Sequence, residues 1–227
     1  MDTTKKGRVK RARASKNHGA QLIEKALCGS TSDVKKALLA GARIDVCDRD
    51  GFTPLMLAIA GKNQKMATYL IEQKADVNRR NKIGQTALML AAQGGYKRLV
   101  EQLIQAGADV RAVDNDKRNA VSWAASRGDF PEVISTLVMF NANPDTRDVR
   151  GITPLMAASL MGHAKTVAVL LTIGADEKRK FRGKTAYQMA AEKGRTDVCQ
   201  TMKAVLRNRP RNALIGGQPT FISSASS

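Results

Sequence analysis

The sequence is short of the residues on which several kinds of protein depend. Of its 227 residues, only three are cysteines, two are histidines and 4% are aromatic. Cys28, Cys47 and Cys199 are odd in number and far apart, which argues against a disulfide framework or a zinc site and favours a reducing compartment. With so few aromatic side chains, the core must be built from Leu, Ile, Val, Ala and Met.

Long apolar runs are also missing. No stretch approaches the roughly 20 apolar residues that cross a bilayer, and the N-terminus is too polar for a secretory signal and develops no bulky apolar face for a mitochondrial presequence. We therefore expect an intracellular protein of the cytoplasm or nucleus, with an organelle matrix left open, and no membrane partner.

Acidic residues are too few to balance the basic ones. The chain has 38 Lys and Arg against 20 Asp and Glu, a net charge of +18. Residues 1–18 carry seven of these cations against Asp2, and residues 207–227 carry three with no acid. About half of the excess charge therefore lies between the tails, so the basic character is not only a tail effect.

The sequence does contain a period of about 33 residues, the kind of signal that predicts a repeat architecture. One slot is filled by Thr53, Thr86, Asn119, Thr153 and Thr185, at spacings of 33, 33, 34 and 32 residues. A second landmark follows each time in constant phase. It reads AGARID at 40–45, QKADVN at 73–78, AGADVR at 106–111, FNANPD at 140–145 and IGADEK at 173–178. With an opening unit at residue 19, this predicts six units.

One unit shows how the repeat folds. Thr153 and Pro154 predict a helix start, because the hydroxyl can accept an orphan N–H and proline suits the first turn. Gly162 ends this short helix, Leu170 belongs to the apolar stripe of a second helix, and Gly174 supplies the left-handed position that stops it. Neither helix can stand alone, so each unit must bury its stripe against the next.

These features resemble the ankyrin repeat over roughly residues 19–206. The match is carried by the Thr-Pro-Leu start, the alanine pair and glycine that follow, the Val-x-x-Leu-Leu run and the Gly-Ala-Asp landmark. The resemblance implies an all-α solenoid with β-hairpin-like loops, flanked by basic tails at 1–18 and 207–227. The units lie near 19–49, 50–82, 83–115, 116–149, 150–181 and 182–206. Unit 116–149 departs most, with Lys117, Asn119 and Ala120 in place of Gly, Thr and Pro, and we expect it to be the softest.

One motif suggests nucleotide chemistry at first. The segment KRKFRGKT, residues 178–185, ends in the Gly-Lys-Thr of a phosphate-binding loop, but that loop needs glycine where Lys178 stands and must follow a buried strand. Thr185 instead fills the threonine slot of the repeat. The segment is therefore predicted to be a hairpin tip, with a solvated charged loop as the alternative.

No other residues predict catalysis, a metal site or a cofactor. His18 lies in the basic tail, and His163 follows Gly162, where a packing or turn role is expected. Acids recur in phase, as at Asp48 and Asp114, which is typical of turn formers rather than of catalysts. We predict a protein that is not an enzyme and has no small-molecule substrate.

The resemblance implies that the hairpin tips and first helices line a concave groove that binds partners. In the C-terminal half, these positions interleave arginines with apolar residues, which favours a contact surface over a merely solvated one. The predicted partner-binding residues are Arg118, Arg127, Arg147, Arg150, Ile152, Leu160, Met161, Arg179, Phe181, Arg182 and Lys184. Arginine suits the role because its planar fork holds carboxylate or phosphate at two points.

The N-terminal tail carries a separate prediction. Its basic residues read as a nuclear import signal or a nucleic-acid contact, which the sequence does not separate, or as a solubilising arm. They are Lys5, Lys6, Arg8, Lys10, Arg11 and Arg13.

Three functions fit these observations. The first is a non-enzymatic protein–protein interaction module that binds a partner with an acidic surface in the concave groove. The second is a basic structural subunit of a ribonucleoprotein, with its tails and groove on RNA. The third, implied by the resemblance, is an inhibitor that plugs a partner enzyme.

Overall fold

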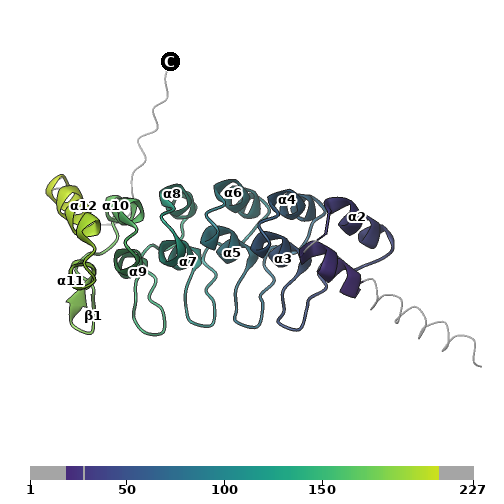
Figure 1. The fold of residues 1–227 in the computed structure, drawn as a ribbon, viewed down its shortest axis with the longest axis horizontal. Coiled ribbons are helices and arrows are strands. Elements are labelled where there is room, and N and C mark those ends of the chain that lie inside the picture. Colours follow the sequence, from purple (N-terminus) through teal and green to yellow (C-terminus); the bar gives the residue numbers. More distant parts are fainter. Residues whose placement is uncertain (1–18, 28, 210–227) are drawn as a thin grey trace, which may run out of the picture.

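The computed structural model describes residues 19–27 and 29–209, which form an elongated stack of short antiparallel helices (Figure 1). Residues 19–27 are helical and are followed by α2 (Thr31–Leu39). The next helices are α3 (Pro54–Ala60), α4 (Gln64–Glu72), α5 (Ala87–Gln93), α6 (Lys97–Gln105), α7 (Ala120–Arg127), α8 (Pro131–Met139), α9 (Pro154–Met161) and α10 (Ala164–Thr172). The short strands β1 (Lys180–Phe181) and β2 (Lys184–Thr185) precede α11 (Ala186–Glu192) and α12 (Thr196–Arg207). The predicted all-α class is confirmed.

The helices lie in two rows. Helices α3, α5, α7, α9 and α11 form an inner row, the even-numbered helices α4 to α12 form an outer row, and the long loops all project from the same side (Figure 1). Helix α7 contacts both α5 and α9 along the inner row, and α10 contacts α8 and α12 along the outer row. The serial stacking predicted from the period is therefore present.

The inner helices begin where the threonine slot predicts. The hydroxyls of Thr53, Thr86 and Thr153 each accept the backbone N–H three residues on, at 3.3–3.4 Å. Asn119 does the same at 2.9 Å through its side-chain oxygen, and Thr185 forms a full capping box with Gln188. Each such cap stabilises a helix by about 1 kcal/mol, which matters for helices of seven or eight residues.

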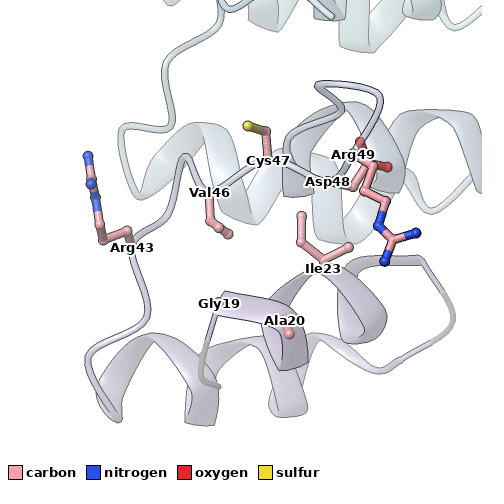
Figure 2. A pocket seen from close by; sticks show the side chains of 8 residues that line it. All are labelled: Gly19, Ala20, Ile23, Arg43, Val46, Cys47, Asp48 and Arg49. Atoms are coloured by element: carbon pink, nitrogen blue, oxygen red, sulfur yellow. The ribbon is translucent and has the colours of Figure 1, made fainter. Parts of the chain in front are cut away.

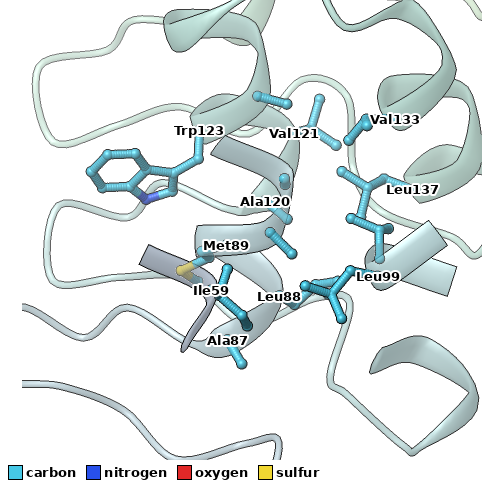
Figure 3. Packing of buried hydrophobic residues seen from close by; sticks show 14 of the residues in the cluster. Ile59, Ala87, Leu88, Met89, Leu99, Ala120, Val121, Trp123, Val133 and Leu137 are labelled. Carbon is cyan, nitrogen blue, oxygen red and sulfur yellow. The ribbon is translucent and has the colours of Figure 1, made fainter. Parts of the chain in front are cut away.

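The core runs through the stack as one continuous cluster. Alanines on the inner helices, such as Ala91, Ala124 and Ala158, are fully buried, and their small side chains let neighbouring helices approach closely. Larger residues fill the space between the rows, where Leu88 and Leu99 pack together (Figure 3). No pair of helices closes this core by itself, so stability accumulates from unit to unit.

The helix ends also follow the sequence. Gly162 is the left-handed C-cap of α9, with φ 86°, and Gly174, with φ 95°, follows the end of α10. At the end of the described chain, Arg209 turns back: its guanidinium donates to the Leu171 carbonyl at 2.9 Å and contacts Glu177 at 3.2 Å. The last helix is thereby fixed to the preceding unit. Cys28 and His18 lie outside the described residues.

Candidate protein-binding surface

The loops before the inner helices end in five tips that we call fingers. They are finger 1 (48–52), finger 2 (81–85), finger 3 (114–118), finger 4 (148–152) and finger 5 (180–184). Each finger leads directly into the capping threonine or asparagine of an inner helix. Because the helices stack in register, the fingers stand in a row on the same side of the molecule (Figure 1).

Fingers 1 to 4 share one turn. In finger 3, a carboxylate oxygen of Asp114 accepts the N–H groups of Asp116 at 2.9 Å and Arg118 at 2.8 Å. Asp48, Asn81 and Asp148 accept the two corresponding N–H groups in their own fingers. The prediction that these phased acids form turns is confirmed, and Asn81 plays the same part without a charge.

Finger 5 is built differently because Lys180 replaces the acid and cannot accept a hydrogen bond. Its turn is held by a two-residue ladder in which Lys180 pairs with Thr185 and Phe181 with Lys184. Arg182 and Gly183 occupy the left-handed region at the tip, with φ of 48° and 78°, as the tightest hairpin turns require. The segment KRKFRGKT is therefore a hairpin tip, as predicted, and not a phosphate-binding loop.

This replacement changes the charge along the row of fingers. Finger 1 carries Asp48 and Asp50, and finger 3 carries Asp114 and Asp116. Finger 5 carries three cations, Lys180, Arg182 and Lys184, and no acid. The positive charge of the row is therefore concentrated at its C-terminal end. Lys180 was not selected from the sequence, although a lysine in a slot otherwise filled by Asp or Asn was the available signal.

Arg118 is engaged within the protein. Its guanidinium contacts Asp114 at 2.9 Å and Asp116 at 3.1 Å and lies over the ring of Trp123, 4.1 Å from the centroid. Only 27% of its side chain is exposed. Arg127, the last residue of α7, is exposed and lies 5.6 Å from the centroid of the same ring. Of the two predicted contacts, Arg127 has the freer guanidinium.

The predicted arginines of the next loop differ in their partners. Arg147 and Arg150 are both exposed, and Arg150 contacts Asp148 at 2.9 Å. Arg147 forms no ion pair within residues 19–27 and 29–209. Arg179 is half-buried and lies 3.4 Å from Asp176, so its charge is largely used inside the stack.

The predicted apolar contacts are unequally exposed. Ile152 and Leu160 are half-buried and pack against the core, whereas Met161 is 52% exposed at the end of α9. Val149, at the tip of finger 4, is 58% exposed. Val149 and Met161 are therefore the exposed apolar residues of this surface, whereas Ile152 and Leu160 expose only part of their side chains.

The predicted residues of finger 5 lie together. Phe181 is half-buried, and the exposed Arg182 lies over its ring at 5.2 Å from the centroid. Lys184 contacts Glu192 of α11 at 2.7 Å. This ion pair is exposed, so it contributes little to stability and leaves the lysine accessible. The predicted import or nucleic-acid residues, Lys5, Lys6, Arg8, Lys10, Arg11 and Arg13, lie outside the described part of the chain.

A second surface feature lies at the opposite end of the stack. A hollow of about 600 Å³ separates helix 19–27 from the loop before finger 1. Ile23 and Val46 point into this space, whereas Arg43 points away from the helix (Figure 2). Apolar side chains therefore line the inner part of this hollow, and residues of finger 1 line its edge.

Residues 19–27 and 29–209 contain neither a cluster of potential metal ligands nor a membrane-spanning helix. No group of three or more His, Cys, Asp or Glu side chains is arranged there to hold a metal ion. No helix in this part of the chain has the length and apolar character needed to cross a membrane. The Nδ1 atom of His163 lies 2.9 Å from the carbonyl oxygen of Ala125, which fits the expected packing role between neighbouring units.

Helix pairs stacked in series, with capped inner helices and a row of fingers, define a class of repeat protein whose projecting surface suits macromolecular contact. The model of ankyrin repeats (3 copies) matches residues 22–114 and 121–207. The chain belongs to the ankyrin repeat family.

Individual relatives agree with this assignment. The chain is 31% identical over 162 residues to the ankyrin repeat and KH domain-containing protein mask-1 of Caenorhabditis elegans, a match that covers 70% of this chain and 6% of mask-1. It is 31% identical over 168 residues to the human ankyrin repeat domain-containing protein 63, covering 70% of this chain and 35% of that protein. A third match, 36% over 63 residues, is to the 26S proteasome non-ATPase regulatory subunit 10 of Dictyostelium discoideum, covering 28% and 27%. The chain therefore spans about a third or less of the length of these relatives.

Proposed function

We propose that this chain is a non-enzymatic interaction module that binds a protein with an acidic surface at its C-terminal fingers. Ankyrin repeats indicate protein–protein interaction as the general role. The observation that carries the finer proposal is the composition of finger 5, whose residues include three cations and no acid. Lys180 and Arg182 form no ion pair with any described residue, whereas Lys184 pairs with Glu192 of α11. Beside them lie the exposed Arg147 and Arg150 of the neighbouring loop.

Apolar contacts complete this surface. Val149 and Met161 are exposed, and the ring of Phe181 is half-buried between cations. Interfaces of moderate affinity combine a few such anchors with a charged rim, in which the charges steer the partner and the anchors slow its release. An acidic protein surface with one or two apolar side chains suits both features.

RNA is a weaker fit to the described fingers. A phosphate backbone following the row would meet the carboxylates of Asp50 and Asp116 on the tips of fingers 1 and 3. Like charges at these tips oppose a continuous polyanion, whereas a protein partner needs acidic residues only near finger 5. We therefore place the acidic protein ahead of a ribonucleoprotein role, and we do not propose enzyme inhibition.

Charge reversal tests the proposal. In affinity capture followed by binding measurements on the captured partner, Arg182→Glu with Lys184→Glu should weaken binding at least about tenfold, since each lost charge-assisted contact contributes roughly 1.5–3 kcal/mol. Lys65→Glu with Lys165→Glu is the matched control, because both lysines are exposed on outer helices and the net charge changes equally. Equal binding by the finger variant and wild type would overturn the assignment.

A further inference from the structure

Fingers 1 to 4 are joined to one another by backbone hydrogen bonds. The N–H of Lys82 donates to the carbonyl of Asp50 at 2.9 Å, and the N–H of Asn115 donates to that of Ile83 at 3.1 Å. Val149 donates to Asp116 at 2.9 Å in the same manner. These bonds hold each finger directly against the next.

The series stops before finger 5. By position, Phe181 would donate to Arg150, but no such bond exists between these two described residues, and Phe181 pairs instead with Lys184 inside its own hairpin. The surroundings of two equivalent glycines, Gly51 and Gly151, differ in the same way. A Cβ built on Gly51 would meet the backbone of finger 2 at 3.0 Å, whereas one on Gly151 would meet only the Phe181 ring, at 3.9 Å. Finger 5 therefore stands apart from finger 4.

The space between the two fingers is a hollow of about 520 Å³. Its lining comprises Arg147, Arg150, Gly151, Lys180, Phe181 and Arg182. Four of these six residues are cationic, none of them is acidic, and the remaining two are a glycine and an aromatic ring. A concave site with this lining concentrates positive potential more strongly than a flat surface with the same charges.

The four cations differ in the contacts that they already make within the protein. Arg150 is paired with Asp148, and Arg182 lies over the Phe181 ring. Arg147 and Lys180 form no ion pair with any described residue. A single carboxylate would leave most of this charge uncompensated, whereas a phosphate monoester carries close to two charges and three strong acceptor oxygens.

We infer that the hollow between fingers 4 and 5 binds a phosphorylated side chain of a partner protein. Arg147 and Lys180 supply the free charges, Arg150 and Arg182 supply planar donors for the phosphate oxygens, and the Phe181 ring packs against the peptide beside the phosphorylated residue. Arginine clusters are a general means of recognising phosphorylated peptides. The inference rests on the proposed function, because the phosphate would be one element of the acidic surface held at finger 5.

A phosphorylated protein suits the geometry better than a nucleic acid does. The cationic lining is confined to one inter-finger space, with Asp148 at the base of finger 4 itself and Asp116 on the next finger, finger 3. One isolated dianion needs only such a local site, whereas single-stranded RNA needs a groove that tracks successive phosphates.

Fluorescence anisotropy on the full chain tests this with three labelled seven-residue peptides, built from glycine and alanine with a central phosphoserine, glutamate or serine. We expect the phosphoserine peptide to bind at least about tenfold more tightly than the other two. Its affinity should rise between pH 5 and 7, because the second phosphate pKa is about 6, while that of the glutamate peptide should not. Arg147→Gln with Lys180→Gln should remove the gain, and Lys65→Gln with Lys165→Gln should retain it.

Amide chemical shifts locate the site. Titration with the phosphoserine peptide should move the signals of Gly151 and Phe181 and leave those of finger 2 in place. Equal affinity for the phosphoserine and glutamate peptides, or tighter binding of a twelve-residue oligouridine, would overturn the inference. A poly-glutamate peptide that binds wild type but not Arg182→Glu with Lys184→Glu would leave the proposed function standing even then.

Discussion

The indole Nε1 of Trp123 donates a hydrogen bond of 3.0 Å to the carboxylate of Asp114, a residue nine positions earlier whose side chain is fully buried. The same carboxylate accepts from Arg118, whose guanidinium lies over the indole ring. Finger 3 is thereby tied to the inner helix that follows it. These internal contacts also explain why Arg118 is less available to a partner than the resemblance to ankyrin repeats implied.

Trp123→Phe should lower the free energy of unfolding by about 1–3 kcal/mol, because it leaves a buried carboxylate short of a donor. Urea denaturation followed by circular dichroism measures the change. Asp114→Asn and the double variant complete a cycle in which the two effects should not add. Additive effects would show that the hydrogen bond contributes little.

Lys117 offers a gain in stability. It holds the left-handed conformation, with φ 62°, in a slot filled by Gly51, Gly84, Gly151 and Gly183 in the other fingers. Lys117→Gly should raise the free energy of unfolding by about 0.5–1 kcal/mol, since relief of the strain exceeds the added chain entropy of glycine. Lys117→Ala keeps the Cβ atom and should give no such gain in the urea midpoint.

Unit 116–149 remains our prediction for the softest part of the stack. Lys117 introduces strain there, although Asn119 compensates in part by donating to the Asn143 carbonyl and to the Thr146 hydroxyl. Hydrogen exchange should show faster opening of α7 and α8 than of α5 and α6. The prediction is wrong if α7 and α8 are the best protected helices of the chain.

Arg209→Ala should destabilise the C-terminal unit, because Arg209 closes the carbonyl end of α10 and contacts Glu177. The expected loss is about 1 kcal/mol, with α12 exchanging its amides faster than before. Arg207→Ala removes an equal charge from an exposed position of α12 and serves as the comparison. A similar loss in both variants would assign the effect to net charge.

Salt dependence distinguishes the two classes of partner. RNA binding should weaken steeply, with log K falling by about 0.7 per phosphate contact for each unit of log salt. An acidic protein held partly by Phe181, Val149 and Met161 should lose affinity with a shallower slope. Isothermal titration at several chloride concentrations provides both slopes.

Much of the fold was predictable from local sequence, because a capping threonine, a turn-forming acid or a left-handed glycine acts within a few residues of itself. Thr153, Asp114 and Gly162 all have the roles that their spacing predicted. The engagement of Arg179 was not predictable in this manner, since its approach to Asp145 depends on contact between units 34 residues apart. The separation of fingers 4 and 5 could not be predicted for the same reason. It depends on Phe181 pairing with Lys184 in its own hairpin instead of donating to Arg150, a residue of the preceding unit.

Because no backbone hydrogen bond joins the described residues of finger 4 to those of finger 5, finger 5 can be replaced without breaking a hydrogen bond to its neighbour. Fingers 1 to 4 are hydrogen-bonded to one another, so a change in one is expected to alter its neighbour. Residues 180–184 are held instead by their own two-residue ladder and by contact with α11. Replacing these five residues with another hairpin should therefore change which partner is bound, while fingers 1 to 4 keep their structure.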